Sequence, residues 1–505
     1  MLAPLRLVVL LALMAPGSGF AQVDAAEPAP LRNTVAADAQ EQARLPPPRT
    51  TEHALAFGDR QLEFTATAGA VTLRSQDSAA EPEADIGYVA YLAAASDPAS
   101  RPVTFVVNGG PGAASAYLHI GALGPWRLPL EGGRIAPSQP VALEPNAETW
   151  LDFTDLVFVD PVGAGFSRLV DPDDELRRRY LSIGGDIEAL AQFVLQWLTE
   201  NGRIASPKYF VGESYGGFRG PLLAETLQTE YGVGLSGLIL VSPVLDFGWR
   251  LQPNHAPLPR VALLPSFAAA AMERRGAFSA PAIAEVEAYA AGEYLTDLLR
   301  GLDDGAATTR LVARLTELTG VPAEVVERTA GRLSLGVFTQ ELFRDARQVA
   351  SAYDAAVAGD DPSPGDRGGP HLDPVLDALT APLTGGMIAH YQNRLDWLPD
   401  RRYVLLNGGV NHSWDWGGGL NQPEAVGPLA KALALDPDLR VLVAHGYTDL
   451  VTPYFASELI LRQLADFGPG GRIALATYPG GHMFYTRDAS RRAFRENALT
   501  LYAAD

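Results

Sequence analysis

The sequence predicts an α/β protein in which helices cover both faces of a mostly parallel sheet. Six short apolar runs lack the polar alternation of a half-exposed strand, and each ends close to a glycine or an acidic residue. Runs of this kind are typical of strands that are buried on both faces. Helical patterns such as residues 187–200 lie between them and give the strand–helix rhythm of a parallel sheet. The runs are residues 103–110, 155–163, 208–214, 237–246, 440–449 and 473–482.

Two further segments with alternating polarity, residues 62–75 and 86–94, predict antiparallel strands at one edge of this sheet. The rhythm breaks between about residues 248 and 395, where helical patterns dominate. Ligands of α/β proteins bind at the carboxyl ends of the strands, so we interpret this insertion as a cap over that edge. A purely structural excursion is the alternative. The helical patterns cover residues 279–302, 322–333 and 339–358.

Composition excludes several classes of function. The chain of 505 residues has a formal net charge of −20, whereas nucleic-acid binding needs basic surfaces. It contains no cysteine, which excludes disulfides, thiol catalysis and cysteine-bound metals. The 47% of hydrophobic residues indicates a globular protein with a large core.

The N-terminus has the pattern of a secretory signal peptide. One cation, Arg6, precedes a short apolar run and a small-residue end, which predicts cleavage after Ala21 and a periplasmic or secreted protein without a stable membrane span. An uncleaved anchor is the alternative. The stretch that follows is rich in alanine and proline and is expected to be an extended leader. The expected order is therefore signal peptide 1–21, leader 22–54, core 55–247, helical cap 248–395 and core 396–505.

The sequence Gly212-Glu213-Ser214-Tyr215-Gly216 has the form G-x-S-x-G. It follows an apolar run directly and precedes a helix-compatible stretch. This is the context of a nucleophile elbow, in which a sharp strand-to-helix turn exposes the serine hydroxyl. We therefore predict that Ser214 is a nucleophile; a serine in a glycine-rich turn is the alternative.

A serine nucleophile needs a base, and His482 follows the last predicted strand in a Gly-Gly-His turn. In the elbow fold the triad follows the order serine, acid, histidine. Asp449 is the expected acid because it lies just past a strand and before His482; Asp246 is its rival. His445 is expected to be a packed or supporting histidine, and Asp160 a structural acid.

Acyl transfer also needs an oxyanion hole, made by donors that face the developing negative charge. The glycine-rich loop after the strand at 103–110 places Gly110 where its amide can be one donor, and the amide of Tyr215 is expected to be the other. A tight structural turn is the alternative for this loop. Trp414 and Trp416 are expected to pack under the insertion, with a place in a pocket as the alternative.

Five motifs spread over residues 108–485 resemble those of the serine carboxypeptidase family: NGGPGAAS, DPVGAGFS, GESYGG, GYTDLVTPY and GGHMFY. The resemblance implies an α/β-hydrolase fold with a largely helical insertion. It also implies that the family's triad falls on Ser214, Asp449 and His482.

The resemblance further implies that Asn108, Gly109 and Glu213 bind the substrate. In the family, the asparagine and the glutamate hold the free carboxylate of the peptide's C-terminus, and the glutamate does so in its protonated form. Two close carboxyls or one desolvated carboxyl can hold the raised pKa that this requires.

The sequence departs from the family's pattern at three positions. Val106 stands where the family commonly has tryptophan, Ala122 where it commonly has a second glutamate, and Ala113 where it commonly has cysteine. The predicted function is a serine-type carboxypeptidase that acts on peptides without cofactor or metal. Val106 and Ala122 leave an esterase, acyltransferase or aminopeptidase as alternatives, and a non-catalytic peptide-binding protein is the alternative from another class.

Overall fold

The computed structural model describes residues 44–503, except 76–80, 96, 131–135, 140–141, 251, 365–371, 418, 420 and 468–470. The expected signal peptide and most of the expected leader lie outside the described residues. Among the helices that are described, none has the length and hydropathy of a membrane span.

One sheet of ten strands forms the centre of the described part of the chain, in the order β1-β2-β3-β7-β4-β9-β10-β13-β14, with β8 paired to β3. The strands from β7 to β14 in this order run parallel, whereas β1, β2, β3 and β7 pair antiparallel. All six apolar runs form strands of the parallel part, so the predicted α/β fold is confirmed. The sheet strands are β1 (Arg49–Phe57), β2 (Arg60–Arg74), β3 (Pro82–Ala93), β4 (Val103–Val107), β7 (Asp155–Val159), β8 (Arg168–Leu169), β9 (Lys208–Glu213), β10 (Gly237–Val241), β13 (Arg440–Gly446) and β14 (Ile473–Tyr478).

Strand β1 begins at Arg49, inside the range 22–54 that was expected to be leader. It pairs with β2 along its whole length, from Arg49 opposite Ala68 to Phe57 opposite Arg60. Its residues alternate between exposed and half-buried, which is the pattern of a strand with one solvated face. The ordered sheet therefore starts earlier than the composition of the leader indicates.

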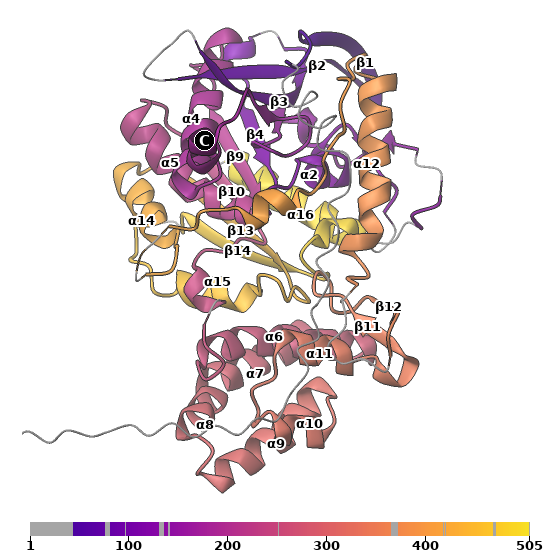
Figure 1. Cartoon of the computed structure of the whole chain (residues 1–505), viewed down its shortest axis with the longest axis vertical. Coiled ribbons are helices and arrows are strands. Elements are labelled where there is room, and N and C mark those ends of the chain that lie inside the picture. Colours follow the sequence, from indigo (N-terminus) through magenta and orange to yellow (C-terminus); the bar gives the residue numbers. More distant parts are fainter. Residues whose placement is uncertain are drawn as a thin grey trace, which may run out of the picture.

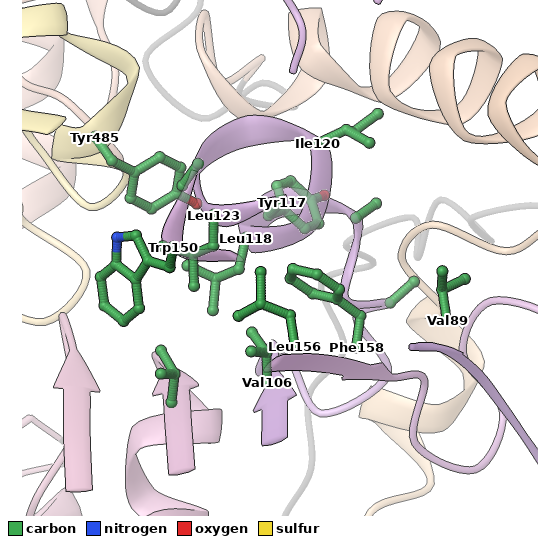
Figure 2. Close-up of a cluster of buried hydrophobic side chains, with 14 of the residues drawn as sticks. Val89, Val106, Tyr117, Leu118, Ile120, Leu123, Trp150, Leu156, Phe158 and Tyr485 are labelled. Carbon is green, nitrogen blue, oxygen red and sulfur yellow. The ribbon is translucent and has the colours of Figure 1, made fainter. Parts of the chain in front are cut away.

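Helices cover both faces of the sheet (Figure 1). Helices α4, α5 and α14 pack on one face, while α2, α12 and α16 pack on the other. Each face of the sheet forms its own apolar cluster with the helices that cover it. In strand β4, Phe105 and Val107 belong to the first cluster, with α4, α5 and α14, and Val106 belongs to the second, with α2, α12 and α16. Figure 2 shows this second cluster, in which Val106, Leu156 and Phe158 lie beneath the helical turn that carries Leu118 and Ile120.

The remaining elements are short or helical. The helices are α2 (Ala116–Leu118), α3 (Asp174–Tyr180), α4 (Ile183–Glu200), α5 (Tyr215–Glu230), α6 (Leu258–Arg274), α7 (Ala280–Tyr289), α8 (Leu295–Arg300), α9 (Gly305–Thr319), α10 (Ala323–Arg328), α11 (Leu335–Glu341), α12 (Leu376–Asn393), α13 (Gly408–His412), α14 (Val426–Leu435), α15 (Tyr454–Leu461) and α16 (Asp488–Tyr502). Single turns of 3₁₀ or π helix are η1 (Pro98–Ser100), η2 (His119–Leu123), η3 (Trp150–Asp152), η4 (Phe247–Trp249), η5 (Ala290–Tyr294), η6 (Arg344–Ala346) and η7 (Phe484–Thr486). Two small sheets pair β5 (Trp126–Arg127) with β6 (Glu144–Pro145) and β11 (Gln348–Ala350) with β12 (Ala358–Asp360).

The insertion forms two different structures. Helices α6 to α11 make a separate lobe with its own apolar core, at the bottom of Figure 1, and this core reaches the main body through α15. Helix α12 instead returns to the main core and packs against α2. The helical prediction for residues 339–358 is wrong beyond Glu341, because this segment forms β11 and then lies against the loops of the candidate site.

Candidate active site

Ser214 lies at the turn between β9 and α5, with φ 61° and ψ −119°. A side chain at positive φ is strained, which costs on the order of 1–3 kcal/mol and is common at active sites. The turn closes because its neighbours are glycine: a Cβ on Gly212 would lie 2.0 Å from the carbonyl oxygen of Gly216. A Cβ on Gly216 would lie 2.8 Å from the carbonyl oxygen of Val107. This geometry is that of a nucleophile elbow, which presents the serine at the carboxyl end of the sheet.

The structure brings Asp449 and His482 into contact from the ends of β13 and β14. Asp449 Oδ2 lies 2.7 Å from His482 Nδ1, and both side chains are buried. Two backbone amides, of Val451 and Thr452, and the hydroxyl of Thr452 donate to the carboxylate of Asp449. These donors hold the carboxylate in place, and the carboxylate occupies Nδ1 of the ring, so Nε2 is the atom available to a substrate or to Ser214.

The carboxylate of Asp449 also sets the proton affinity of His482. Burial favours the neutral ring, but the charge and hydrogen bond of Asp449 outweigh it, so the pKa of His482 is raised above its usual value. A base near neutral pKa suits proton transfer at neutral pH.

The other acidic and histidine residues considered for the triad make different contacts. Asp246 caps the turn η4 by accepting from the amide of Gly248. His445 contacts Ser457 through Nε2, and burial lowers the pKa of His445 to about 4. Asp160 accepts hydrogen bonds from the amide and hydroxyl of Ser115, which is a structural arrangement.

The glycine loop after β4 packs directly on the elbow. A Cβ on Gly109 would lie 2.6 Å from the amide nitrogen of Tyr215 and 2.7 Å from the carbonyl oxygen of Glu213, so only glycine fits there. Tyr215 is the first residue of α5, where backbone amides have no partner within the helix. Gly110 has φ 98° and lines the same pocket as Ser214. The amides of Gly110 and Tyr215, which we expect to hold an oxyanion, therefore belong to two segments that contact each other: the glycine loop and the start of α5.

Glu213 is buried beside the nucleophile and has two hydrogen-bond donors. Asn108 Nδ2 lies 2.7 Å and the Tyr485 hydroxyl 2.8 Å from the same oxygen, Oε2. Asn108 is itself fixed, because its Oδ1 accepts from the amide of Leu118 and its carbonyl accepts from Arg219. Oε1 is left for a substrate group.

Burial raises the pKa of the Glu213 carboxyl to about 7, although His482 and the hydrogen bonds from Tyr485 and Asn108 act in the opposite direction. The carboxyl is thus able to hold a proton near neutral pH and to donate it in a hydrogen bond. Tyr485 was not among the residues singled out from the sequence. Its position three residues after His482, inside the motif GGHMFY, was the signal that pointed to it.

A pocket of about 390 Å³ collects these groups. Ala113 lines it, whereas Val106 and Ala122 are buried in the core beneath it. Trp416 also lines the pocket, while Trp414 is buried against Tyr215. No group of three or more acidic or histidine residues suited to a metal occurs among the described residues. The lining residues include Asn108, Gly109, Gly110, Glu213, Ser214 and His482.

The fold and this site define the class of protein: the chain has an α/β-hydrolase fold with an elbow serine beside a histidine–aspartate pair. The fold is similar to that in the crystal structure of KEX1(delta)p, a prohormone-processing carboxypeptidase from Saccharomyces cerevisiae, with a TM-score of 0.53 and 15% identity. That alignment covers 87% of this chain and 91% of the other.

Residues 61–248 match the sequence model of the family described as serine carboxypeptidase. Serine carboxypeptidase-like 33 of Arabidopsis thaliana is 30% identical over 168 residues, which cover 31% of this chain and 32% of that protein. The pheromone-processing carboxypeptidase KEX1 of Yarrowia lipolytica is 30% identical over 148 residues, 29% of this chain and 22% of that protein. The chain thus spans about a third of the length of the first curated relatives it matches. The similarity to the serine carboxypeptidase family is therefore found over residues 61–248, in the N-terminal half of the chain.

Proposed function

We propose that this protein is a serine carboxypeptidase that removes C-terminal residues from peptides. The observation that carries the proposal is the Asn108–Glu213 pair, which lines the same pocket as Ser214 and His482. A protonated Glu213 donates from Oε1 to the free carboxylate of the substrate, and the amide group of Asn108 lies beside it. A carboxylate held at this position puts the last peptide bond over Ser214.

In this mechanism Ser214 Oγ attacks the carbonyl carbon of that bond while His482 Nε2 takes the hydroxyl proton. The amides of Gly110 and Tyr215 hold the oxyanion, and Asp449 stabilises the imidazolium. Collapse of the intermediate breaks the C–N bond, and His482 gives its proton to the leaving amine. Water then attacks the acyl ester, His482 takes a proton from it, and the shortened peptide leaves with Ser214 restored.

Mass spectrometry of an N-acylated peptide tests the proposed activity. Successive loss of single residues from the C-terminus, absent with Ser214→Ala, is the expected result. Internal cleavage, or release from the N-terminus of an unblocked peptide, would contradict it. A wild-type protein that folds but does not react with a fluorophosphonate would point to a peptide-binding protein without catalysis.

A second candidate is an esterase, acyltransferase or aminopeptidase with the same triad. Val106 and Ala122 favour it, because these two buried apolar residues stand where the family commonly has tryptophan and glutamate. Hydrolysis of simple esters with no cleavage of any free-acid peptide would support this candidate.

We also propose that the protein is exported, on the signal-peptide pattern of residues 1–21. Expression of the full chain in a bacterial host, followed by fractionation and N-terminal sequencing, tests this. A mature protein that begins at Gln22 in the periplasm or the medium is expected, whereas an intact N-terminus in the cytoplasm would contradict it.

A further inference from the structure

Arg250 is the cation that lines the same pocket as Ser214 and His482. Its side chain forms no ion pair with a carboxylate among the residues that the structure describes. The charge nevertheless reaches the site, because it opposes protonation of His482 and lowers the pKa that Tyr353 would otherwise have. In a chain of net charge −20, an arginine without an acidic partner beside a nucleophile needs an explanation.

The backbone that carries Arg250 is held in place. The preceding turn, η4, is capped by Asp246, and the amide of Phe247 donates to the carbonyl of Pro423. The amide of Arg250 donates to the carbonyl of Phe247. The arginine is therefore presented by a fixed turn, although its own side chain is exposed.

Arg250 and the proposed carboxylate pair reach the pocket from different elements. Glu213 ends β9 and Asn108 follows β4, whereas Arg250 follows the turn η4. Phe247, in that turn, and Trp416 belong to the apolar cluster around the Tyr215 ring. Tyr117 and Met483 line the pocket from the larger core, which also contains Tyr485, the partner of Glu213.

We propose that Arg250 forms a subsite for an acidic side chain on the acyl side of the scissile bond, the penultimate residue of the peptide. This rests on the proposed carboxypeptidase function, in which Glu213 and Asn108 hold the terminal carboxylate and leave Arg250 to the preceding residue. A guanidinium pairs with a carboxylate through two parallel hydrogen bonds, which glutamine cannot match. Aspartate and glutamate are thus the side chains selected.

Four blocked dipeptides test this subsite: acyl-Glu-Phe, acyl-Gln-Phe, acyl-Phe-Glu and acyl-Phe-Gln. The wild type is expected to cleave acyl-Glu-Phe with a kcat/KM about two- to fivefold above that for acyl-Gln-Phe, the range of an exposed ion pair. The preference should shrink in 0.5 M salt. Arg250→Gln should abolish the preference and Arg250→Glu reverse it, each read as the ratio of acyl-Glu-Phe to acyl-Gln-Phe cleavage within one variant, while the control Arg328→Gln on α10 retains it.

The outcomes separate this subsite from the proposed function. Equal cleavage of acyl-Glu-Phe and acyl-Gln-Phe overturns the subsite and leaves the carboxypeptidase standing. A preference confined to the terminal position, or one that survives Arg250→Gln, also overturns it. Failure to cleave any of the four peptides refutes the proposed function, and the subsite with it.

A second, independent observation concerns Asp354, in the part of the insertion that does not form a helix. Residues 352–355 lie between the loop of Asp449 and the loop of His482. The amide of Leu450 donates to the carbonyl of Ala352 at 3.0 Å, and the amide of His482 donates to the carbonyl of Tyr353 at 2.5 Å. A Cβ on Gly481 would lie 1.9 Å from that carbonyl oxygen, so the packing is close.

Asp354 joins both loops through its two carboxylate oxygens. Oδ1 accepts from the hydroxyl of Thr448 at 2.7 Å, and Thr448 precedes Asp449. Oδ2 accepts from Arg487 at 2.9 Å, five residues beyond His482. Arg487 also pairs with Glu273 of α6, at 3.0 Å, which ties the network to the helical lobe.

From these contacts we infer that Asp354 is a positioning residue that fixes the spacing between Asp449 and His482. It touches neither of them and acts through the loops that carry them. Small displacements of catalytic groups lower the rate strongly, by as much as about 100-fold for 1 Å. This part of the insertion therefore contributes to the order of the site.

Thr448→Val and Thr448→Ser form the matched test, since valine removes the hydroxyl at the same volume and serine retains it. Thr448→Val is expected to lower kcat and the rate of inactivation by a fluorophosphonate about tenfold with KM unchanged, whereas Thr448→Ser stays near wild type. Asp354→Asn should have the same effect. The double variant Thr448→Val/Asp354→Asn should be no slower than either single variant, because both changes break the same hydrogen bond. The surface control Asp360→Asn should change nothing.

The fluorophosphonate rate needs only the nucleophile and its base, so it reports on Asp354 even if no peptide is cleaved. An inactivation rate within twofold of wild type for both Thr448→Val and Asp354→Asn overturns the inference. A rise in KM with kcat unchanged also overturns it, because that result assigns the network to substrate binding.

Discussion

Glu213→Gln is expected to remove the loss of peptidase activity on the alkaline side of neutrality. In the proposed mechanism Glu213 binds the substrate carboxylate only when it is protonated, and burial raises its pKa to about 7. Glutamine is uncharged at every pH. Its carbonyl oxygen can still accept from Asn108 and Tyr485, which leaves its NH₂ group where Glu213 Oε1 stands.

The size of the effect follows from that pKa. With a pKa of about 7, the protonated fraction of Glu213 is about nine-tenths at pH 6 and about one-tenth at pH 8. His482 acts as a base in its neutral form, and its pKa is raised, so activity also falls on the acid side. The wild type should therefore give a bell-shaped profile, whose two apparent pKa values belong to the coupled pair.

The assay is kcat/KM for one blocked dipeptide from pH 5 to pH 9. Between pH 6 and pH 8, the ratio of Glu213→Gln to wild-type activity should rise about tenfold, because only the wild type loses its donor. The variant should keep the acid limb, which reports His482. An alkaline limb that is the same in both proteins would refute the role of Glu213, and so would an unchanged preference for a free carboxylate.

Three further changes probe other parts of the site. Ser214→Ala should lower kcat by about a millionfold and abolish labelling by a fluorophosphonate, with the melting temperature retained; residual labelling would identify another nucleophile. Gly109→Ala should lower kcat about 100-fold, because its Cβ would lie 2.6 Å from the Tyr215 amide; near wild-type turnover would exclude that amide as an oxyanion donor. Tyr485→Phe removes a hydrogen bond that favours the ionised form of Glu213, so the alkaline limb of the pH profile should move to higher pH; a shift to lower pH would contradict the assignment.

The parallel sheet was predictable from sequence because its strands are buried on both faces. Phe105 and Val106 point to opposite faces of the sheet, yet both are buried, so the run lacks the polar alternation of a half-exposed strand. Strand β1 was missed because half of its residues face solvent and its composition resembles the leader before it. The elbow around Ser214 was recognisable because its glycines are required by contacts within a few residues.

The predictions failed where contacts between distant segments decide the structure. Residues 339–358 have a helical pattern, but the segment that includes Asp354 gains hydrogen bonds from two loops about 100 residues downstream, and these replace a helix. Arg250 carries no local pattern of its own, and the motif that contains Tyr485 does not show which group its hydroxyl contacts. Their interest comes from the groups they face, Glu213 and the triad, which the sequence alone does not bring together.

The central claim is that the pocket recognises a free C-terminal carboxylate. The most direct test compares kcat/KM of the wild-type protein for one blocked dipeptide and for its C-terminal amide, at neutral pH. A hydrogen bond to a charged group contributes about 1.5–3 kcal/mol, so the free acid should be cleaved at least about tenfold faster than the amide. Equal cleavage of the two would contradict the account.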